Sequence, residues 1–229
     1  MHWREGRRQG FKLFRCYNGN IEMEYWYRFL QNFIIKPGTW ILIHLFYRVE
    51  ISGRENFRNL RRPLIIVSNH IAFYDSFLLG LALPLFSPLV PLRYMGEYQK
   101  FYHPFLDFLR KIGLIPLLFF IMGVFPSRRG EGIDVAIQTP LRILSDGGTV
   151  VMFPEGRVSK TRELREFRHG ASALALKSGA PVLPVAMKRE GDKIFVNIGS
   201  AFKLANPHPA SIEEGTQKLR EKIQELLKP

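Results

Sequence analysis

A short, continuous apolar run that leads at once into a helical pattern is the feature that most constrains this chain. Residues 64–67 read Leu-Ile-Ile-Val, which is typical of a strand buried on both faces, and residues 76–83 form the apolar face of a helix. The same alternation recurs downstream, with strands expected at 89–95, 149–153, 181–187 and 193–199 and helices at 131–145, 169–178 and 211–228. Strands interleaved with helices predict a single α/β domain with a largely parallel sheet flanked by helices.

Two local signals refine the expected helices. Ser211 followed by Glu214 is the pattern of a capping box, so the last helix is expected to begin there. Pro140 lies inside the helix expected at 131–145, and proline removes a helical hydrogen bond. We therefore expect that helix to start late, kink or break.

Composition limits the kinds of partner. The chain has 229 residues, 46% of them hydrophobic, which is enough for one sizeable core. Its single cysteine, Cys16, excludes an internal disulfide framework, and no Cys/His cluster has the spacing of zinc ligands. A formal net charge of +13 indicates an anionic partner, which charge alone leaves open between nucleic acid, an anionic membrane surface and a phosphorylated substrate.

The first fifty residues favour the membrane surface. They combine basic residues with aromatic rings, and all three tryptophans of the chain lie here, at positions 3, 26 and 40. Amphipathic rings settle at headgroup depth, and neighbouring cations attract anionic lipid. We therefore expect residues 1–50 to form a membrane-docking helical segment, with a helical hairpin at 21–50 broken at residues 36–38, and residues 51–229 to form the α/β domain. The alternative is that these aromatics pack on the domain's own core.

No segment predicts a membrane span or a nucleic-acid motif. The longest apolar stretch, residues 112–125, would reach about 21 Å as a helix, against a hydrocarbon core of about 30 Å. Charged residues interrupt every apolar run near the N-terminus, so no signal-peptide core is present. Because no nucleic-acid-binding signature accompanies the positive charge, nucleic acid is not an expected partner.

His70 and Asp75 form the first candidate catalytic pair. On one straight helix their five-residue offset would leave the side chains about 140° apart. If residues 70–74 form a turn and Asp75 opens the following helix, the carboxylate can accept the Nδ1 proton of His70 and leave Nε2 free as a base. The alternative is that Asp75 is only a helix cap and His70 only a loop residue.

Two further clusters follow expected strands, where α/β sheets bind their ligands. Residues 123–132, GVFPSRRGEG, end an apolar strand in Arg128 and Arg129. Residues 150–159, VVMFPEGRVS, end another in Glu155, Gly156 and Arg157. The planar fork of arginine suits phosphate oxygens, and a glycine lets the backbone approach a substrate closely.

Four segments taken together resemble the glycerolipid acyltransferases, and among them most the bacterial 1-acylglycerol-3-phosphate acyltransferases. NHIAFYD is similar to the family's His-x-x-x-x-Asp motif, and GVFPSRR, FPEGR and APVLPVAM follow in the family's order over roughly residues 63–190. The resemblance implies acyl transfer from acyl-carrier protein or coenzyme A to the free hydroxyl of lysophosphatidic acid, giving phosphatidic acid. It implies no metal and no cofactor beyond the thioester co-substrate. The aromatic and basic residues 1–50 suggest that the protein docks on the cytoplasmic face of the membrane.

The resemblance also implies a role for each matching residue. The general base is His70 and its orienting partner Asp75, the phosphate-binding arginine is Arg129, and the acceptor-side residues of the third block are Glu155 and Gly156. The further arginines near these motifs suggest that Arg157 or Arg128 assists Arg129. Two departures stand out. The family usually has a threonine between the third-block glycine and arginine, whereas here Arg157 follows Gly156 directly. The family often has a lysine near residues 95–96, a role that Arg93 or Lys100 would have to fill.

The chemistry is consistent with one base. An alcohol is a poor nucleophile at neutral pH, but a thioester is already activated, so a base that removes the hydroxyl proton suffices. Cys16 lies far in sequence from every motif, so no covalent acyl-enzyme is expected. Two alternatives remain: the same chemistry on glycerol 3-phosphate or another lysophospholipid, and a basic peripheral protein that binds lipid without turnover.

Overall fold

The computed structural model of the protein describes residues 21–96, 104–128, 130–159, 163–204 and 211–228. At its centre is a seven-stranded sheet with the order β1-β7-β6-β2-β5-β3-β4. The strands are β1 (Arg48–Ser52), β2 (Leu64–Ser68), β3 (Leu92–Gly96), β4 (Val124–Pro126), β5 (Thr149–Met152), β6 (Val182–Glu190) and β7 (Lys193–Ile198). All neighbouring pairs are parallel except β6 and β7, which confirms the predicted, largely parallel sheet.

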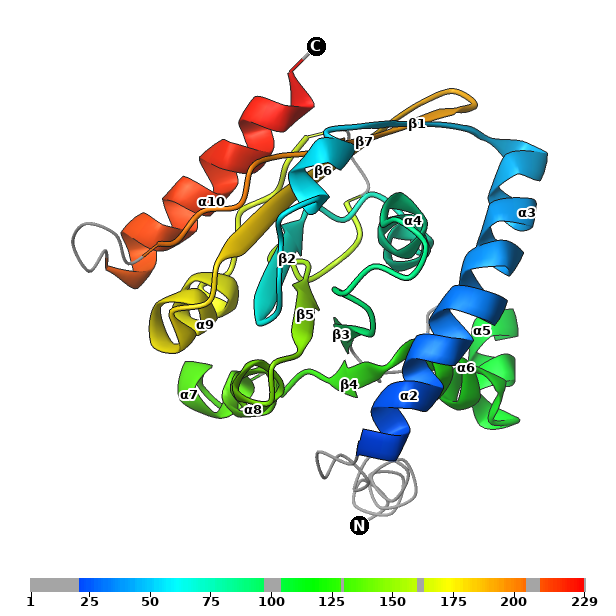
Figure 1. The fold of residues 1–229 in the computed structure, drawn as a ribbon, viewed down its shortest axis with the longest axis horizontal. Coiled ribbons are helices and arrows are strands. Elements are labelled where there is room, and N and C mark those ends of the chain that lie inside the picture. Colours follow the sequence, from blue (N-terminus) through cyan, green and yellow to red (C-terminus); the bar gives the residue numbers. More distant parts are fainter. Residues whose placement is uncertain (1–20, 97–103, 129, 160–162, 205–210, 229) are drawn as a thin grey trace.

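The central strand β2 shows why the sheet needs helices on both faces. Its five residues are all buried, and successive side chains point to opposite faces. Leu64 and Ile66 pack with α4 (Asp75–Ala82), while Ile65 and Val67 pack with α8 (Gln138–Ser145), α9 (Gly170–Ser178) and α10 (Ile212–Leu227). Figure 1 shows the two helical layers on either side of the sheet.

The remaining helices are short or lie at the margins of the sheet. They are η2 (Arg54–Phe57), α5 (Pro104–Lys111), α6 (Leu114–Met122) and α7 (Ile133–Ala136). The helix expected at 131–145 is indeed broken, into α7 and α8, and Pro140 lies in the first turn of α8, where its missing N–H costs little. The capping box is confirmed: the Glu214 amide donates to Ser211 Oγ at 3.1 Å, and the Ser211 amide donates to Glu214 Oε2 at 2.8 Å.

The predicted hairpin at 21–50 is wrong. The helix α2 (Ile21–Leu30), the π-helical turn η1 (Gln31–Ile35) and α3 (Lys36–Phe46) follow one another without a break, as the blue ribbon of Figure 1 shows. The wider π turn accommodates the Pro37 ring, which would otherwise collide with the preceding turn. Residues 21–46 are called the docking helix below. The expected domain boundary after residue 50 falls inside β1, an edge strand with alternating burial.

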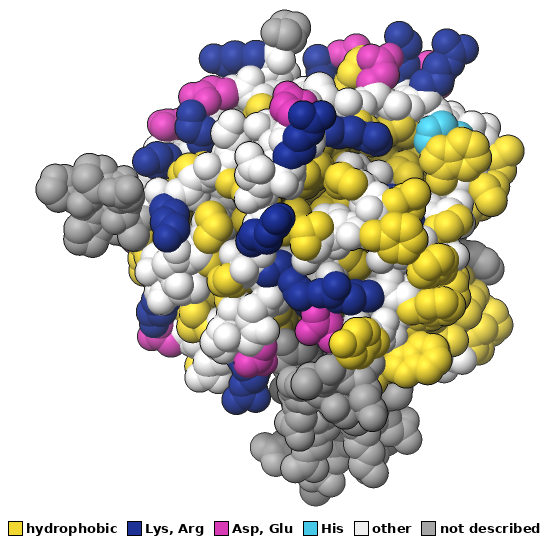
Figure 2. Space-filling model, viewed as in Figure 1, with side chains coloured by type: hydrophobic (Ala, Val, Ile, Leu, Met, Phe, Trp, Pro, Cys, Tyr) yellow, Lys and Arg dark blue, Asp and Glu magenta, His cyan; other side chains and the backbone are white. Residues whose placement is uncertain are grey.

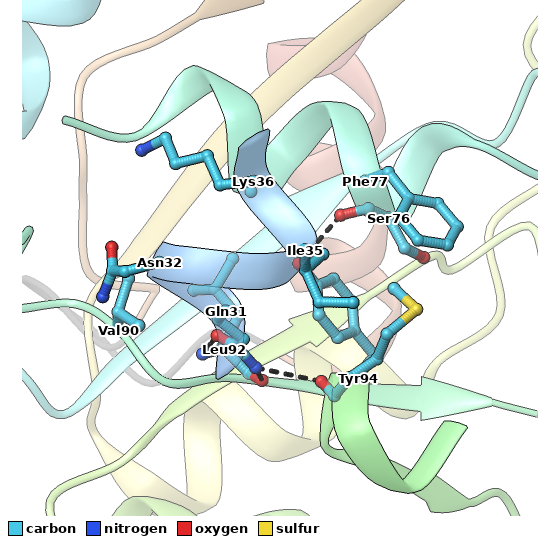
Figure 3. Close-up of a pocket in the computed structure, with 11 residues that line it drawn as sticks. Gln31, Asn32, Ile35, Lys36, Ser76, Phe77, Val90, Leu92 and Tyr94 are labelled. Atoms are coloured by element: carbon cyan, nitrogen blue, oxygen red, sulfur yellow. Dashed lines mark hydrogen bonds between the residues drawn. The ribbon is translucent and has the colours of Figure 1, made fainter. Parts of the chain in front are cut away.

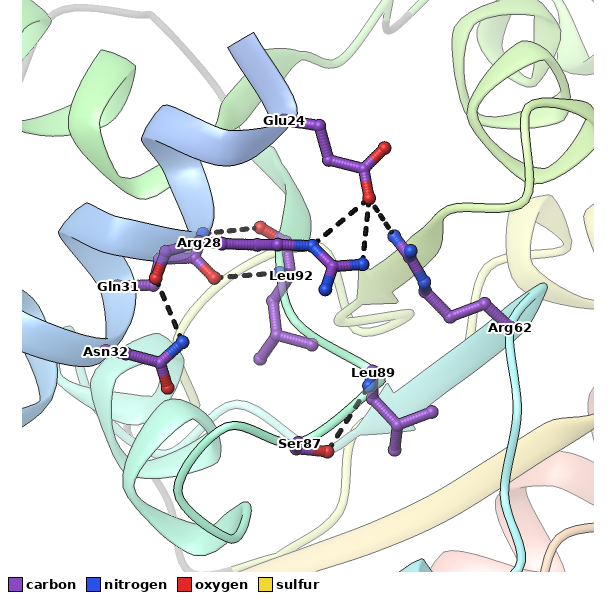
Figure 4. Close-up of polar contacts among 8 residues, drawn as sticks. All are labelled: Glu24, Arg28, Gln31, Asn32, Arg62, Ser87, Leu89 and Leu92. Atoms are coloured by element: carbon purple, nitrogen blue, oxygen red, sulfur yellow. Dashed lines mark hydrogen bonds and ion pairs between the residues drawn. The ribbon is translucent and has the colours of Figure 1, made fainter. Parts of the chain in front are cut away.

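A side-chain clamp fixes the docking helix to the sheet. Gln31 Nε2 donates to the Leu92 carbonyl at 2.9 Å, and the Leu92 amide donates back to Gln31 Oε1 at 2.8 Å (Figure 4). Gln31 Nε2 also donates to the Met122 carbonyl at 3.0 Å. Figure 4 also shows Glu24 accepting from Arg28 and Arg62, whose contacts are 3.0 and 2.7 Å long. The clamp holds the helix against the start of β3, and the ion-pair group joins it to the segment that precedes β2.

A small cavity of about 20 Å³ lies beside the clamp, between the docking helix, α4 and β3 (Figure 3). The Lys36 side chain lines it and donates from Nζ to the Leu83 carbonyl. Burial lowers the pKa of Lys36 to about 8, and the charge of Arg54 acts in the same direction.

Among the described residues, no helix is both long enough and apolar enough to cross a membrane.

Candidate active site

The candidate residues gather where the parallel strands end. Asn69 and His70 follow β2, Phe153 to Gly156 follow β5, and Ser127 and Arg128 follow β4. Because β2, β5, β3 and β4 run parallel and adjacent, these segments lie along one edge of the sheet. The described parts of the three clusters therefore lie along the same edge of the sheet.

His70 and Asp75 meet through a turn. The chain leaves β2, turns over residues 70–74, and enters α4 at Asp75, which is completely buried. Asp75 Oδ2 lies 2.7 Å from His70 Nδ1 and accepts the amide protons of Ile71 and Ala72 at 2.7 and 2.9 Å. A carboxylate only accepts, so Nδ1 is the donor and Nε2 of His70 is left with a lone pair.

The imidazole is held from two further directions. Its ring stacks on Phe153, with centroids 4.4 Å apart and planes 20° apart. Its backbone amide donates to Glu155 Oε1 at 2.8 Å, and its carbonyl accepts from the Ser159 amide at 2.7 Å. The His70 side chain is one-fifth exposed, so the ring is positioned but remains reachable.

Both carboxylate oxygens of Glu155 accept hydrogen bonds from backbone amides. Oε2 accepts from the Arg165 amide at 3.2 Å while Oε1 accepts from the His70 amide. Burial raises the pKa of Glu155, and the two backbone donors act in the opposite direction. The carboxylate thus joins the loop after β5 to the loop that carries His70.

A pocket of about 360 Å³ opens next to Phe153 at the ends of β3, β4 and β5. Arg128 and Arg168 both line it, together with Gly156 and Ser127. The Ser127 hydroxyl is buried, and no partner for it is found among the described residues. Two guanidinium groups and a hydroxyl form a binding set suited to a phosphate group.

Gly156 is needed at its position for two reasons. Its φ is +70°, in the left-handed region that favours glycine, and a Cβ there would lie 3.0 Å from Arg168 Nε. Glycine therefore lets the Arg168 side chain pass close to the turn after β5. Sequence reasoning missed Arg168. The available signal was a basic residue two positions before Gly170, where α9 begins at the sheet edge.

The other arginines expected at the site fall elsewhere or outside the described residues. Arg129 and Lys100 lie outside them. Arg157 is exposed and is not among the described residues that line the 360 Å³ pocket. Arg93 is buried, with its guanidinium 4.5 Å from the centre of the Tyr27 ring on the docking helix, and so does not reach the site.

A second pocket lies on the other side of the His70 loop. It has a volume of about 460 Å³ and is lined by Asn69 and Ile71, by the loop after β5, and by the end of β6. Asn69 completes its wall by exchanging two hydrogen bonds of 2.8 Å with the backbone of Met187. The neighbours of His70 in the chain thus line this second pocket, while Phe153, on which the His70 ring stacks, lines the first.

This geometry defines an α/β protein with a buried carboxylate, an oriented histidine and a cationic pocket at one sheet edge. A family model described as "Acyltransferase" matches residues 48–188. The chain belongs to the acyltransferase family.

Known proteins agree with this assignment. The chain is 32% identical to the chloroplastic 1-acyl-sn-glycerol-3-phosphate acyltransferase of Brassica napus, over 72% of this chain and 44% of that protein. It is 29% identical to the lyso-ornithine lipid O-acyltransferase of Pseudomonas aeruginosa, over 65% of this chain and 50% of that protein. The chain thus spans half or less of the length of these relatives.

One solved structure shares the fold. The 1-acyl-sn-glycerophosphate (LPA) acyltransferase PlsC from Thermotoga maritima superposes with a TM-score of 0.63 at 21% identity, covering 83% of this chain and 76% of that one. This likeness supports the α/β architecture described above.

Proposed function

We propose that this chain transfers a fatty acyl group from an acyl-carrier-protein or coenzyme A thioester to the free hydroxyl of 1-acylglycerol 3-phosphate, giving phosphatidic acid. The observation that carries the proposal is the His70–Asp75 contact of 2.7 Å beside a pocket lined by Arg128 and Arg168. The sequence relatives named above include an enzyme of this activity.

His70 acts as the general base. Its Nε2 removes the hydroxyl proton of the acceptor as that oxygen attacks the thioester carbonyl carbon, and the imidazolium is stabilised by Asp75. Collapse of the tetrahedral intermediate breaks the carbon–sulfur bond, and the thiolate takes the proton back from Nε2. The step needs neither a nucleophilic side chain nor a metal.

The cationic pocket binds the phosphate of the acceptor. Arg128 and Arg168 supply charge-assisted donors. The family resemblance assigns the same role to Arg129, which lies outside the described residues. A cationic pocket favours a phosphorylated acceptor over the lyso-ornithine lipid of the bacterial relative named above. Glycerol 3-phosphate and other phosphate-bearing lysolipids remain the second candidates.

The docking helix supports our further proposal that the reaction takes place at the cytoplasmic leaflet. Large apolar side chains on it are exposed to solvent, among them Trp26 at 61%, Trp40 at 54% and Phe46 at 71%. A soluble protein rarely leaves such a surface bare, and an apolar helix face with aromatic residues suits a leaflet. Figure 2 shows hydrophobic side chains gathered on the side of the molecule where α2 and α3 run.

A thiol-release assay tests this function. Wild-type protein is incubated with acyl-carrier-protein or coenzyme A thioesters and a panel of acceptors with and without phosphate. We expect thiol release that depends on 1-acylglycerol 3-phosphate and disappears in His70→Ala. No thiol release with any acceptor, from protein that still binds vesicles, would favour the non-catalytic lipid-binding alternative.

A further inference from the structure

A second apolar surface lies outside the docking helix, on the α/β domain itself. It consists of six exposed side chains from the loop between α4 and β3 and from α5 and α6, here called the domain patch: Leu85, Phe86, Phe108, Ile112, Leu114 and Leu117. Each of them is about half exposed or more. The six come from segments that the proposed docking by residues 1–50 leaves out.

The helix α6 does not have the composition of a soluble surface helix. Its sequence, LIPLLFFIM, contains no polar residue, yet only Ile115 and Met122 are buried. Leu114 and Leu117 are 49% and 54% exposed. A surface helix normally carries a polar face toward water, so a helix that is apolar on its exposed side indicates a nonpolar surrounding medium.

Phe86 adds backbone strain to the same surface. Among the described residues it is the one non-glycine residue with a positive φ, +56°, and its ring is 67% exposed. A residue with a bulky side chain rarely adopts a positive φ, because that backbone conformation is strained. The Phe86 ring is not buried in the protein, so its packing there does not offset the strain. The strained loop holds the ring outward.

Aromatic contacts join the patch to the docking helix. The Phe29 and Phe33 rings are 5.1 Å apart, and the Phe33 and Phe86 rings are 5.7 Å apart. On the α6 side, Tyr27 and Phe120 lie 5.8 Å apart. Figure 1 shows α5 and α6 beside the docking helix, so the two apolar surfaces are continuous.

The charged residues on and beside these two surfaces are mostly basic. Residues 25–49, 76–96 and 108–130 contain Lys and Arg but no Asp or Glu. Two carboxylates beside these ranges are paired with basic residues. Asp107 is buried and held by Arg110 and Lys111 at 2.8 and 3.2 Å, and Glu24 is held by Arg28 and Arg62 at 3.0 and 2.7 Å. Two copies packed through this face would bring like charges together, whereas anionic headgroups would complement it.

We propose that the domain patch enters an anionic phospholipid leaflet together with the docking helix, so that the α/β domain itself binds lipid. The inference deepens the proposed membrane docking and rests on it. Because Phe73, 51% exposed, lies between His70 and Asp75 in the sequence, binding through the domain also keeps the catalytic loop close to the lipid.

Vesicle flotation of the full chain tests the proposal. The test variant is Leu114→Gln/Leu117→Gln, which removes two exposed apolar side chains and keeps good helix formers. We expect its partition onto phosphatidylglycerol/phosphatidylcholine vesicles to fall at least tenfold. The matched control is Ile133→Gln, which changes an exposed apolar residue of α7 on the opposite side of the sheet and leaves flotation unchanged.

Two comparisons make the result decisive. The test variant should keep wild-type thiol release on a short-chain, monomeric acceptor, which separates loss of lipid binding from failure of the proposed chemistry. Flotation equal to wild type would overturn the proposal. Unchanged flotation with a shift from dimer to monomer in analytical ultracentrifugation would do the same, and would assign the patch to contact between copies.

Discussion

One oxygen of Asp75 accepts the Nδ1 proton of His70 at 2.7 Å while it also accepts two backbone amides of the intervening turn. The other oxygen, Oδ1, is buried with no partner among the described residues. The carboxylate therefore orders the turn and the imidazole through the same atom. Replacing Asp75 by asparagine can therefore separate its structural contribution from its catalytic one.

Asp75→Asn should abolish most activity and keep the fold. The asparagine oxygen can occupy the Oδ2 position and accept the same three donors, with its NH₂ at the unpartnered Oδ1 position, but the negative charge is lost. We expect kcat to fall about 10³- to 10⁴-fold, as when a carboxylate that orients a catalytic histidine is neutralised. The melting temperature should change little. The effects of His70→Ala and Asp75→Asn on kcat should not add. The double variant should lose about as much activity as the more damaged single variant, because both substitutions disable the same step.

Glu155→Gln should lower kcat with little effect on the acceptor KM. Glutamine offers one acceptor oxygen to the two amides of His70 and Arg165, so one buried N–H loses its partner at a cost of about 1–3 kcal/mol. We expect kcat to fall about tenfold through displacement of His70. The pH profile of the remaining activity should match wild type, since the base is unchanged. A tenfold rise in acceptor KM instead would assign Glu155 to direct substrate binding.

Arg168→Ala and Arg128→Ala should each raise the acceptor KM about tenfold or more, because a charge-assisted contact is worth roughly 1.5–3 kcal/mol. The effect should vanish with an acceptor that lacks the phosphate. Arg142→Ala, an exposed arginine of α8, is the matched control. A larger effect from Arg157→Ala than from Arg168→Ala would show that Arg157 fills the third-block role after all.

Sequence patterns predicted the parts of this fold that depend on local periodicity. β2 is apolar on both faces because the sheet is covered on both sides, and the capping box from Ser211 to Glu214 spans only four residues. The hairpin was mispredicted because Pro37 usually ends a helix, whereas here a π turn gives its ring room. That accommodation depends on the contacts of η1 with the domain, which no local pattern contains.

The site divides in the same way. His70 and Asp75 are close in sequence, so a turn was enough to predict their contact. Arg168 comes from a segment after the third motif and reaches the pocket only because Gly156 leaves space for it. The two oxygens of Glu155 bind amides 85 and 10 residues away, a relationship that only tertiary packing creates.

Gln31→Ala should destabilise the protein. The Gln31 side chain makes three hydrogen bonds to the backbone of Leu92 and Met122. Its removal leaves two carbonyls and one amide without this hydrogen-bond partner. At about 1 kcal/mol for each bond, we expect a loss of about 2–3 kcal/mol, measured by urea unfolding. Gln217→Ala, which removes an exposed i,i+4 contact on α10, should cost about 0.5 kcal/mol or less. Equal losses in the two variants would mean that the clamp does not hold the docking helix.

Lys36 should make stability rise with pH in the alkaline range. Its pKa is about 8 in the folded protein, lowered chiefly by burial, against 10.5 for an exposed lysine. Between these two values the unfolded chain binds more protons than the folded one, so the free energy of unfolding increases as pH rises through that window.

The measurement is the difference in unfolding free energy between wild type and Lys36→Met from pH 7 to pH 10.5, in which the titrations of all other groups cancel. The free energy of unfolding of wild type should increase relative to that of Lys36→Met as pH rises. The Lys36→Arg control stays charged throughout the window and should show no such gain over Lys36→Met, because an arginine does not lose its proton there. A wild-type curve parallel to that of Lys36→Arg would mean that Lys36 keeps its charge when the docking helix packs against the Leu83 carbonyl.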